Sequence, residues 1–285
     1  MKESIETLDW LGQPVRCRGC PHEAMHRDGR CGKGRACVRD RRVKRVDRFF
    51  REHPALADTY LVHPYFEVRA MAAKYASLFR LPALLADPEP EVRAMAALRL
   101  PAERVKTLAQ DADRRVRIAV ASRLDGQALL AMLADDDYYV RMIVVRGMAP
   151  DLLPIAINDP EPEVRRWVAR RIVDDRLIEM CHDEDPLVRL EVAERMAPKR
   201  LAVFANDPDL RVRFTAAERI EPNELHPFLA DAEAIVRDVA MQRLLAITRK
   251  QIEDMNDGIG CEQDNEADLP LKSLPIDSSD RGREE

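Results

Sequence analysis

The sequence contains few aromatic residues, 5% in all, and only 10 glycines among 285 residues. Strands favour aromatic side chains and tight turns favour glycine, so this scarcity argues against a sheet-rich fold. No segment alternates apolar and polar residues over any length, and we therefore predict no strands. Apolar residues make up 46% of the chain, and alanine, leucine, arginine and glutamate dominate, which favours an all-α fold.

Long apolar runs are also missing. No stretch approaches the ~18 apolar residues of a transmembrane helix, so we expect no membrane partner. The first residues, MKESIETLDWLGQPVR, are charged and lack the apolar segment of a secretory signal peptide. We therefore expect a cytoplasmic protein, whose cysteines stay reduced.

Catalytic and nucleotide-binding patterns are absent as well. The chain has no GxGxxG motif and no P-loop, and no arrangement of His with Asp and Ser, or of His with Glu, is evident. We therefore expect that the protein is not an enzyme.

Charge is unevenly distributed along a chain whose net charge is -5. Residues 16–48 contain twelve Lys and Arg against four Asp and Glu, whereas residues 251–285 contain three against eleven. Residues 49–250 are nearly neutral, which speaks against a nucleic-acid partner because such proteins show a basic excess along one face. The acidic tail at 251–285, rich in Asp, Glu, Asn, Ser and Pro, is predicted to be disordered.

A repeat with a fixed period of 24 residues fills the middle of the chain. The dipeptide Val-Arg recurs eight times at this spacing, and an aspartate stands five residues before the valine in seven of the eight repeats. The valines are Val68, Val92, Val116, Val140, Val164, Val188, Val212 and Val236. A fixed period of this length predicts a solenoid, in which each repeat buries its apolar face only by stacking on its neighbours. We assign eight helical repeats to residues 63–250, and a degenerate first repeat or cap to residues 38–62.

One well-kept repeat, residues 87–110, shows how each repeat is expected to fold. Its apolar residues from Val92 onward follow helical spacing, and Pro101 ends the helix after about ten residues. The following segment around Val105 has only about two turns, and is predicted to be partly 3₁₀. Asp87 precedes the helix and is predicted to be its N-cap.

The repeated aspartates and arginines, such as Asp87 and Arg93, allow two interpretations. The simpler one is a ladder of helix caps and salt bridges that links consecutive repeats. The other is a functional stripe for phosphate or for acidic partners. We favour the ladder, because the body of the chain is nearly neutral.

Four of the six cysteines lie near the N-terminus, in the pattern Cys17-x2-Cys20-x10-Cys31-x5-Cys37. In a reducing compartment such a group is more typical of a metal site than of disulfides, so we assign residues 1–37 to a metal module. Four thiolates satisfy either a tetrahedral zinc ion or a [4Fe–4S] cluster. The wide spacing and glycine-rich loop of the second pair favour the cluster, with zinc as the alternative.

Other residues with metal-binding or packing potential receive simpler interpretations. His22 and His26 lie between the cysteine pairs, but four cysteines already complete a site, so we interpret both as polar loop residues. Cys181 and Trp167 fall in apolar columns of the repeat, and both are predicted to pack in the core. Cys261 lies in the acidic tail and is interpreted as an incidental free thiol.

The repeat and the cysteine segment together resemble a known family. DPEPEVRAMAALRLPAERVKTLAQ is similar to the leucine-rich repeat variant, and CRGC…RCGKGRAC is similar to the iron–sulfur module that precedes it in that family. The resemblance covers about residues 10–250. It implies alternating α- and 3₁₀-helices in a right-handed superhelical solenoid. It also implies a [4Fe–4S] cluster held by Cys17, Cys20, Cys31 and Cys37, but it implies no activity.

These features lead us to expect an iron–sulfur-binding scaffold without enzymatic activity. Its solenoid surface would bind a protein, and its cluster would be redox-active, sensory or structural. One alternative is an electron-transfer protein whose basic N-terminal segment docks an acidic partner. Another alternative is a zinc-stabilised binding solenoid with no redox role.

Overall fold

A computed structural model describes residues 7–259, with side chains described as far as residue 254. The described chain is helical throughout, apart from loops and two isolated bridges, Leu8 to Pro14 and Gly32 to Ala36. It divides into two compact units, Met1–Ala197 and Pro198–Glu285. The prediction of an all-α repeat fold without strands is therefore confirmed for the described residues.

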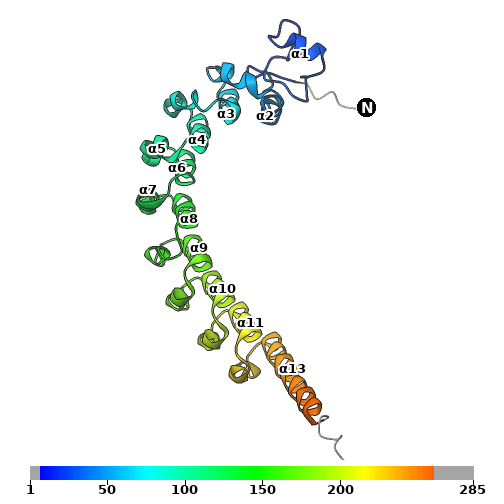
Figure 1. Ribbon diagram of the computed structural model, residues 1–285, viewed down its shortest axis with the longest axis vertical. Helices are drawn as coiled ribbons and strands as arrows, with labels where there is room; N and C mark the ends of the chain where they lie inside the picture. Colours follow the sequence, from blue (N-terminus) through cyan, green and yellow to red (C-terminus); the bar gives the residue numbers. More distant parts are fainter. Residues whose placement is uncertain (1–6, 260–285) are drawn as a thin grey trace, which may run out of the picture. The chain divides into compact units, whose positions relative to one another are not determined.

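Unit 1 alternates α-helices with 3₁₀ or short helical segments (Figure 1). Beyond the short α1 (Glu23–Arg27), its α-helices are α2 (Val43–Glu52), α3 (Phe66–Tyr75), α4 (Pro90–Arg99), α6 (Arg114–Ala121), α8 (Tyr138–Gly147), α9 (Pro162–Arg171) and α10 (Pro186–Arg195). The second segments are η1 (Pro54–Tyr60), η2 (Leu81–Ala86), α5 with η3 (Ala102–Val105, Lys106–Gln110), α7 with η4 (Gly126–Leu130, Ala131–Ala134), η5 (Leu153–Ala156) and η6 (Asp174–Met180). In Figure 1 the two kinds of segment form separate rows, and the α-helices of unit 1 lie on its concave side.

Unit 2 shows the same alternation. It contains η7 (Pro198–Phe204), α11 (Leu210–Arg219), η8 (Pro222–Glu224), α12 (His226–Leu229) and α13 (Ala234–Ile259). Helix α13 runs past residue 250, so residues 251–259 are helical where the sequence analysis predicted a disordered tail. The reason is local, because α13 contains neither proline nor glycine before Gly258. The rest of that predicted tail, with Cys261, lies outside the described residues.

The buried positions of the core recur with the 24-residue period of the sequence. All eight valines of the Val-Arg dipeptides are at most 1% exposed. The alanine pairs that follow, such as Ala96 and Ala97, are fully buried, and their small side chains let neighbouring helices approach closely. Cys181 is also buried, as its place in an apolar column predicted. Because burial of one valine contributes about 1.5 kcal/mol or more, the stacked valine column is a principal source of stability.

A ladder of arginine–aspartate pairs joins consecutive repeats. Arg93 donates from Nε and Nη2 to the two carboxylate oxygens of Asp111 in the next repeat, at 2.8 and 2.7 Å. Its Nη1 donates to the carbonyl of Asp87 at 2.9 Å. The same two-pronged pairing recurs at Arg69–Asp87, Arg117–Asp135, Arg141–Asp159, Arg165–Asp183 and, within unit 2, Arg213–Asp231. The salt-bridge ladder predicted from the sequence is therefore confirmed within each unit.

The capping role predicted for the ladder aspartates is wrong. The N-cap of α4 is Glu89, and Asp87 instead accepts the backbone N–H of Glu89 at 2.9 Å while Arg69 binds its carboxylate. The side-chain caps are other aspartates, which lie two residues after the ladder position of their repeat. Each accepts a hydrogen bond from the backbone N–H of the residue two positions after itself. These caps are Asp113, Asp137, Asp185 and Asp209. Within each unit, the first aspartate of a repeat lies too early to cap the helix, and its carboxylate binds the arginine of the preceding repeat.

Replacing Asp111 with asparagine is expected to lower the melting temperature at neutral pH, by an amount that shrinks in acid. The hydrogen bonds from Arg93 hold the pKa of Asp111 below its usual value of 3.8, against the opposing effect of burial. A carboxylate with a depressed folded-state pKa stabilises the fold above its unfolded pKa, and this contribution is lost as the pH falls through the folded value. Thermal unfolding of both proteins from pH 7 downward measures the difference.

The difference in melting temperature should be constant at neutral and mildly acidic pH and should shrink below pH 3.8. The matched control is Asp151→Asn, at an exposed aspartate outside the ladder, which should leave the melting temperature unchanged throughout. A difference for Asp111→Asn that stays the same in strong acid would contradict the ladder's electrostatic role.

Candidate metal centre

The four N-terminal cysteines line a single small cavity. Cys17, Cys20, Cys31 and Cys37 all face it, and every cysteine among the described residues is free of disulfide bonds. Within the described part of the chain, no three His, Cys, Asp or Glu side chains are arranged to hold a single metal ion. A zinc site requires four sulfurs converging at about 2.3 Å from one ion, whereas a cluster is held by thiols spread around a larger object. Four thiols around one cavity are compatible with either group, and the choice of a four-iron cluster stays a prediction.

Two local structures bring the cysteines together. Cys20 donates its N–H to the carbonyl of Cys17 at 3.1 Å, and the turn depends on Gly19, whose φ of +74° disfavours other residues. Gly32 and Ala36 form an isolated antiparallel bridge, closed by backbone hydrogen bonds of 2.9 and 3.1 Å. Cys31 and Cys37 immediately flank this bridge, so it holds them side by side. The x5 spacing is therefore the length of the small loop that the bridge closes.

Burial and charge differ among the four thiols. Cys37 is buried, and burial raises the pKa of its thiol to about 11. The pKa of Cys31 is also raised, first by burial and then by Cys20 and Cys17, while Arg35 and Arg30 oppose this shift. Ligating thiols must be deprotonated, so metal binding at this site would release protons. Arg16 and Arg39 also line the cavity, where their cationic side chains would offset the negative charge of deprotonated thiols.

Both histidines of the connecting loop reach the cavity but have other partners. His22 Nε2 lies 2.6 Å from the hydroxyl of Tyr60, and His26 Nδ1 lies 3.2 Å from the carbonyl oxygen of Cys31. Burial, together with the charge of His53, lowers the pKa of His22, which favours its neutral form. These contacts agree with a supporting role for both side chains, while the ligand set of four cysteines stays a prediction.

An aromatic cluster joins the cysteine module to the first repeats. His22 packs against Phe49 of α2 and Tyr60 of η1, with ring centroids 5.1 and 5.8 Å apart. Trp10 stacks on Tyr65, just before α3, at 5.9 Å. This cluster was not predicted from the sequence, although aromatic residues are concentrated between Phe49 and Phe66. Residues 38–62 supply α2 and η1, the same pair of segments as a repeat, and carry most of this contact.

Hydrogen bonds hold the module in the same place. Cys37 donates its N–H to the carbonyl of Arg45 in α2, at 3.2 Å. The guanidinium of Arg45 binds Asp40 at 2.8 Å, and the side chain of Asp40 is only 1% exposed. His53 Nε2 lies 3.0 Å from the carbonyl oxygen of Arg30. The last cysteine is therefore tied directly to the first helix of the solenoid.

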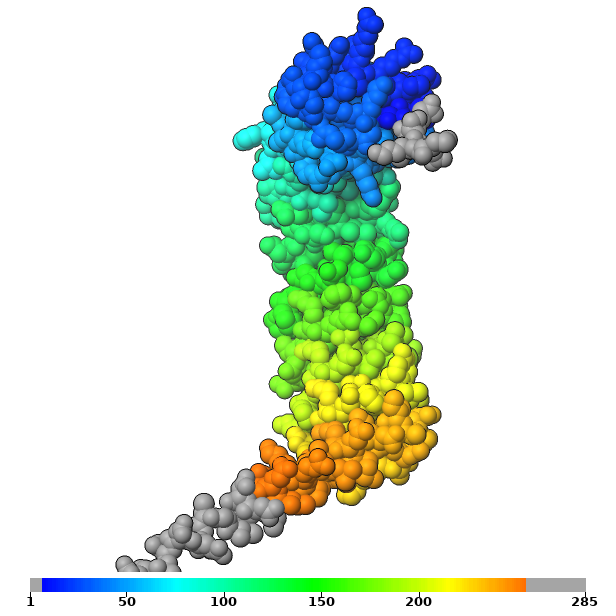
Figure 2. Space-filling model, turned by 90° about the vertical axis from the view of Figure 1, so that its right-hand side faces the viewer, coloured from blue at the N-terminus to red at the C-terminus, as the bar shows by residue number. Residues whose placement is uncertain are grey.

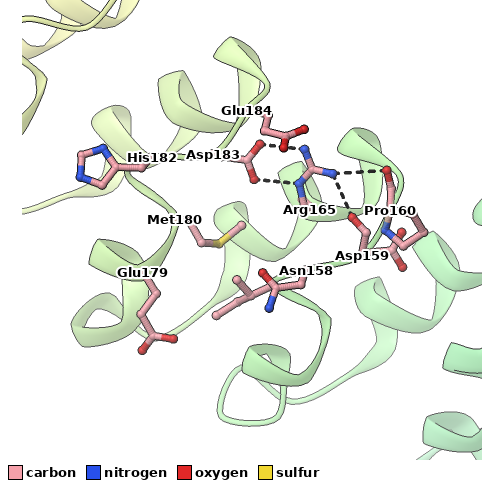
Figure 3. Close-up of a pocket in the computed structure, with 10 residues that line it drawn as sticks. Asn158, Asp159, Pro160, Arg165, Glu179, Met180, His182, Asp183 and Glu184 are labelled. Carbon is pink, nitrogen blue, oxygen red and sulfur yellow. Dashed lines mark hydrogen bonds and ion pairs between the residues drawn. The ribbon is translucent and has the colours of Figure 1, made fainter.

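A groove of about 390 Å³ in unit 1 lies away from the cysteines, around Arg165 and Asp183 (Figure 3). Arg165 reaches across it to both oxygens of Asp183, and donates from Nη1 to the carbonyl of Asp159 at 2.9 Å. A similar groove of about 340 Å³ surrounds Arg117 and Asp135, two repeats earlier. Since the groove recurs with the ladder, it is a consequence of repeat stacking, and we assign it no ligand.

Comparisons with known proteins match both parts of the chain. Residues 7–59 match the family described as "LRV protein FeS4 cluster", and residues 90–113 and 114–137 match "Leucine rich repeat variant". A solved structure described as "a leucine-rich repeat variant with a novel repetitive protein structural motif" is 38% identical. It superposes with a TM-score of 0.72, over 81% of this chain and 99% of its own length.

A curated relative matches over a shorter span. Over 89 residues the chain is 51% identical to an uncharacterized 27.7 kDa protein in the nifB 3′ region of Rhodobacter capsulatus. The match spans 31% of this chain and 36% of the relative, so the chain covers only about a third of that protein. Among the described residues, no helix is both long and apolar enough to cross a membrane.

Proposed function

The chain belongs to the leucine-rich repeat variant family, and from this premise we propose that it is an iron–sulfur interaction scaffold. A [4Fe–4S] module closes the N-terminal end of the solenoid, whose surface binds a protein partner. In this proposal the chain performs no catalytic step, and it functions in a reducing compartment such as the cytoplasm, where free thiols are retained.

The observation that carries the proposal is the shared cavity of the four cysteines, seated against the first helices of the solenoid. Cys17, Cys20, Cys31 and Cys37 would hold the cluster, which when bound supplies one-electron redox chemistry. Arg16 and Arg39 line the same cavity and would offset the negative charge of the four thiolates. The contact of His22 with Tyr60 connects the ligand loop to the first 3₁₀ segment.

The same contacts give the cluster a structural effect on the solenoid. The first helix, α2, receives the N–H of Cys37, and its Phe49 packs under His22. A solenoid needs a terminal cap because the apolar face of its first repeat has no preceding neighbour. Loss of the cluster would free the cysteine loops and weaken this cap, which couples the state of the cluster to the binding surface.

Electron transfer is a second candidate function, favoured by the exposure of the site. Cys17, Cys20 and Cys31 are only half-buried, so one side of the cavity approaches solvent. Exposed cations lie close to the cysteines in the sequence, among them Arg18 after Cys17 and Lys33 two residues after Cys31. A basic rim beside a solvent-near cluster suits the docking of an acidic redox partner, because opposite charges steer the encounter.

The decisive measurement is the iron, zinc and acid-labile sulfide content of protein purified without oxygen, with its EPR spectrum. We expect about four iron and four sulfide per chain. One zinc with no sulfide would replace the cluster with a structural zinc ion, and would leave a plain binding solenoid. On the same sample, a reversible midpoint potential would support electron transfer, whereas decomposition on reduction would remove that candidate.

A further inference from the structure

The exposed face of the α-helices in unit 1, here called the α-face, is turned toward the viewer in Figure 2. Its side chains change from mainly apolar at α2 to α4 to aromatic and cationic at α8 and α9. At its N-terminal end a groove of about 350 Å³ is lined mainly by apolar side chains. They come from successive helices: Val43 of α2, Phe66 and Met71 of α3, and Met95 and Leu98 of α4. Methionine side chains adapt to the shape of a bound apolar group, so this end of the α-face suits apolar anchors from a partner.

The 24-residue register carries the same positions into α8 and α9, where they become aromatic and cationic. The positions of Met95 and Leu98 in α4 correspond to Trp167 and Arg170 in α9. Two guanidinium groups contact the ring of Trp167, with Arg146 at 4.6 Å and Arg170 at 5.1 Å from its centroid. Trp167 was predicted to pack in the core, but its side chain is only half-buried, because this column of the repeat faces outward beside the arginines.

The arginines of this region exceed the carboxylates that bind them. Arg166 and Arg170 both pair with Glu191, at 3.5 and 2.7 Å, and Arg166 also lies 3.8 Å from Glu163. The buried Nε of Arg166 makes no hydrogen bond. Among the described residues no ion pair binds Arg146, which is exposed on α8. Positive charge is therefore available here to an incoming carboxylate.

The exposed residues of the α-face are of the types that are common in protein-binding surfaces. Tyr138 and Tyr139 at the start of α8 are each 41% exposed. Tryptophan, tyrosine and arginine are the residues that most often dominate the energy of protein–protein contacts. Concave faces of repeat proteins serve as extended binding surfaces, because neighbouring repeats present equivalent positions in a row.

We infer that the α-face binds an acidic segment of a protein partner. Apolar residues of that segment fill the groove at α3 and α4, and its carboxylates meet Arg146 and Arg170. This inference rests on the proposed function, since it names the partner class of the same scaffold. A protein fits better than a nucleic acid, because the groove is lined mainly by apolar side chains and carboxylates such as Glu163 and Glu191 lie among the arginines.

Tryptophan fluorescence tests the inference directly. Trp10→Phe leaves Trp167 as the single tryptophan of the full chain. The probe is a synthetic peptide with leucines at one end and glutamates at the other, and its control has glutamines in place of the glutamates. We expect a saturable change in emission with the glutamate peptide alone.

Two variants locate the binding surface, and one controls for the loss of charge. Arg146→Ala should weaken binding about tenfold or more, as loss of a central contact does. Leu98→Ser, at the exposed edge of the groove, should weaken it as well. Arg104→Ala removes an exposed arginine from α5, in the other row of segments, and should leave the affinity unchanged.

Three outcomes would overturn the inference. The first is that the glutamate peptide causes no saturable change in the tryptophan emission of the folded protein. The second is equal affinity for the glutamate and glutamine peptides, and the third is an affinity that Arg146→Ala does not change. Binding of oligothymidylate in place of the peptide, with the same sensitivity to Arg146→Ala, would assign the α-face to nucleic acid instead. Iron and sulfide content measured on the same samples separates the proposals, because an intact cluster without peptide binding rejects only the α-face.

Discussion

Cys31→Ser protein is expected to purify with almost no iron or acid-labile sulfide, and its first repeats are expected to unfold before the rest. Cys31 is one of four thiols around the cavity, and a hydroxyl is a poor ligand for iron. The side chain is half-buried, so the substitution itself disturbs packing little. The expected loss of stability therefore comes from the cluster and from the loops that it holds.

Local unfolding can be followed by hydrogen exchange at the amides of α2 and α3. These helices carry the contacts with the module, through Phe49 of α2 and through Trp10 against Tyr65 at the start of α3. Exchange should accelerate there and stay slow in α8 and α9, because each repeat contacts only its neighbours. The matched control is Cys181→Ala, which removes a buried cysteine outside the cavity and should leave the iron content unchanged.

The opposite result would also be informative. A Cys31→Ser protein that loses the cluster but keeps its exchange pattern and melting temperature would show that the cap holds without metal. The cluster would then have a redox or sensory role, and the structural coupling proposed between cluster and solenoid would be wrong.

Arg141→Ala is expected to destabilise unit 1 by about 3–5 kcal/mol, the range for breaking one partner out of a buried ion pair. Arg141 is 9% exposed and binds both oxygens of Asp159, at 2.8 and 2.9 Å. It also donates to the carbonyls of Asp135 and Asp136, at 2.9 and 3.2 Å. The substitution leaves a carboxylate with a side chain only 7% exposed, and two carbonyls, without their donor.

Urea unfolding measures the effect of Arg141→Ala. Because the lost contact lies between neighbouring repeats, we also expect the transition to broaden as the segments on either side uncouple. Arg115→Ala is the matched control, since Arg115 also pairs with an aspartate, Asp113, but is largely exposed, and its loss should change little. A small effect at Arg141, similar to that of the control, would mean that the ladder specifies register without stabilising the fold.

The double variant Arg141→Leu with Asp159→Leu separates these two roles. Replacing a buried ion pair by apolar residues of similar size is often neutral, whereas removing one partner is costly. The double variant should therefore recover much of the lost stability. Recovery should be incomplete, because Asp159 also accepts the backbone N–H of Glu161 at 2.9 Å.

The sequence alone was sufficient for the solenoid. A single 24-residue repeat is too small to bury its own valine, so the valine becomes buried only when neighbouring repeats stack on it. The structure buries all eight of these valines. The spacing of the second segment likewise predicted short 3₁₀ helices, because two turns before the next aspartate leave no room for a longer helix. The sequence also indicated that the four cysteines form one site, because residues close together in the chain can come together with little long-range structure.

Tertiary structure decided what depends on contacts between repeats and between the module and the solenoid. Asp87 and Glu89 precede α4 by similar distances, and only stacking shows that Asp87 is bound by Arg69, 18 residues earlier. Only the folded chain shows that Trp167 faces outward, because the periodic column that it shares with Met95 does not distinguish a buried face from a concave surface. The seat of the cysteine module on Phe49 and Tyr60 likewise required the fold. Periodicity determines which residues share a face, whereas the packing of one repeat on the next determines what that face meets.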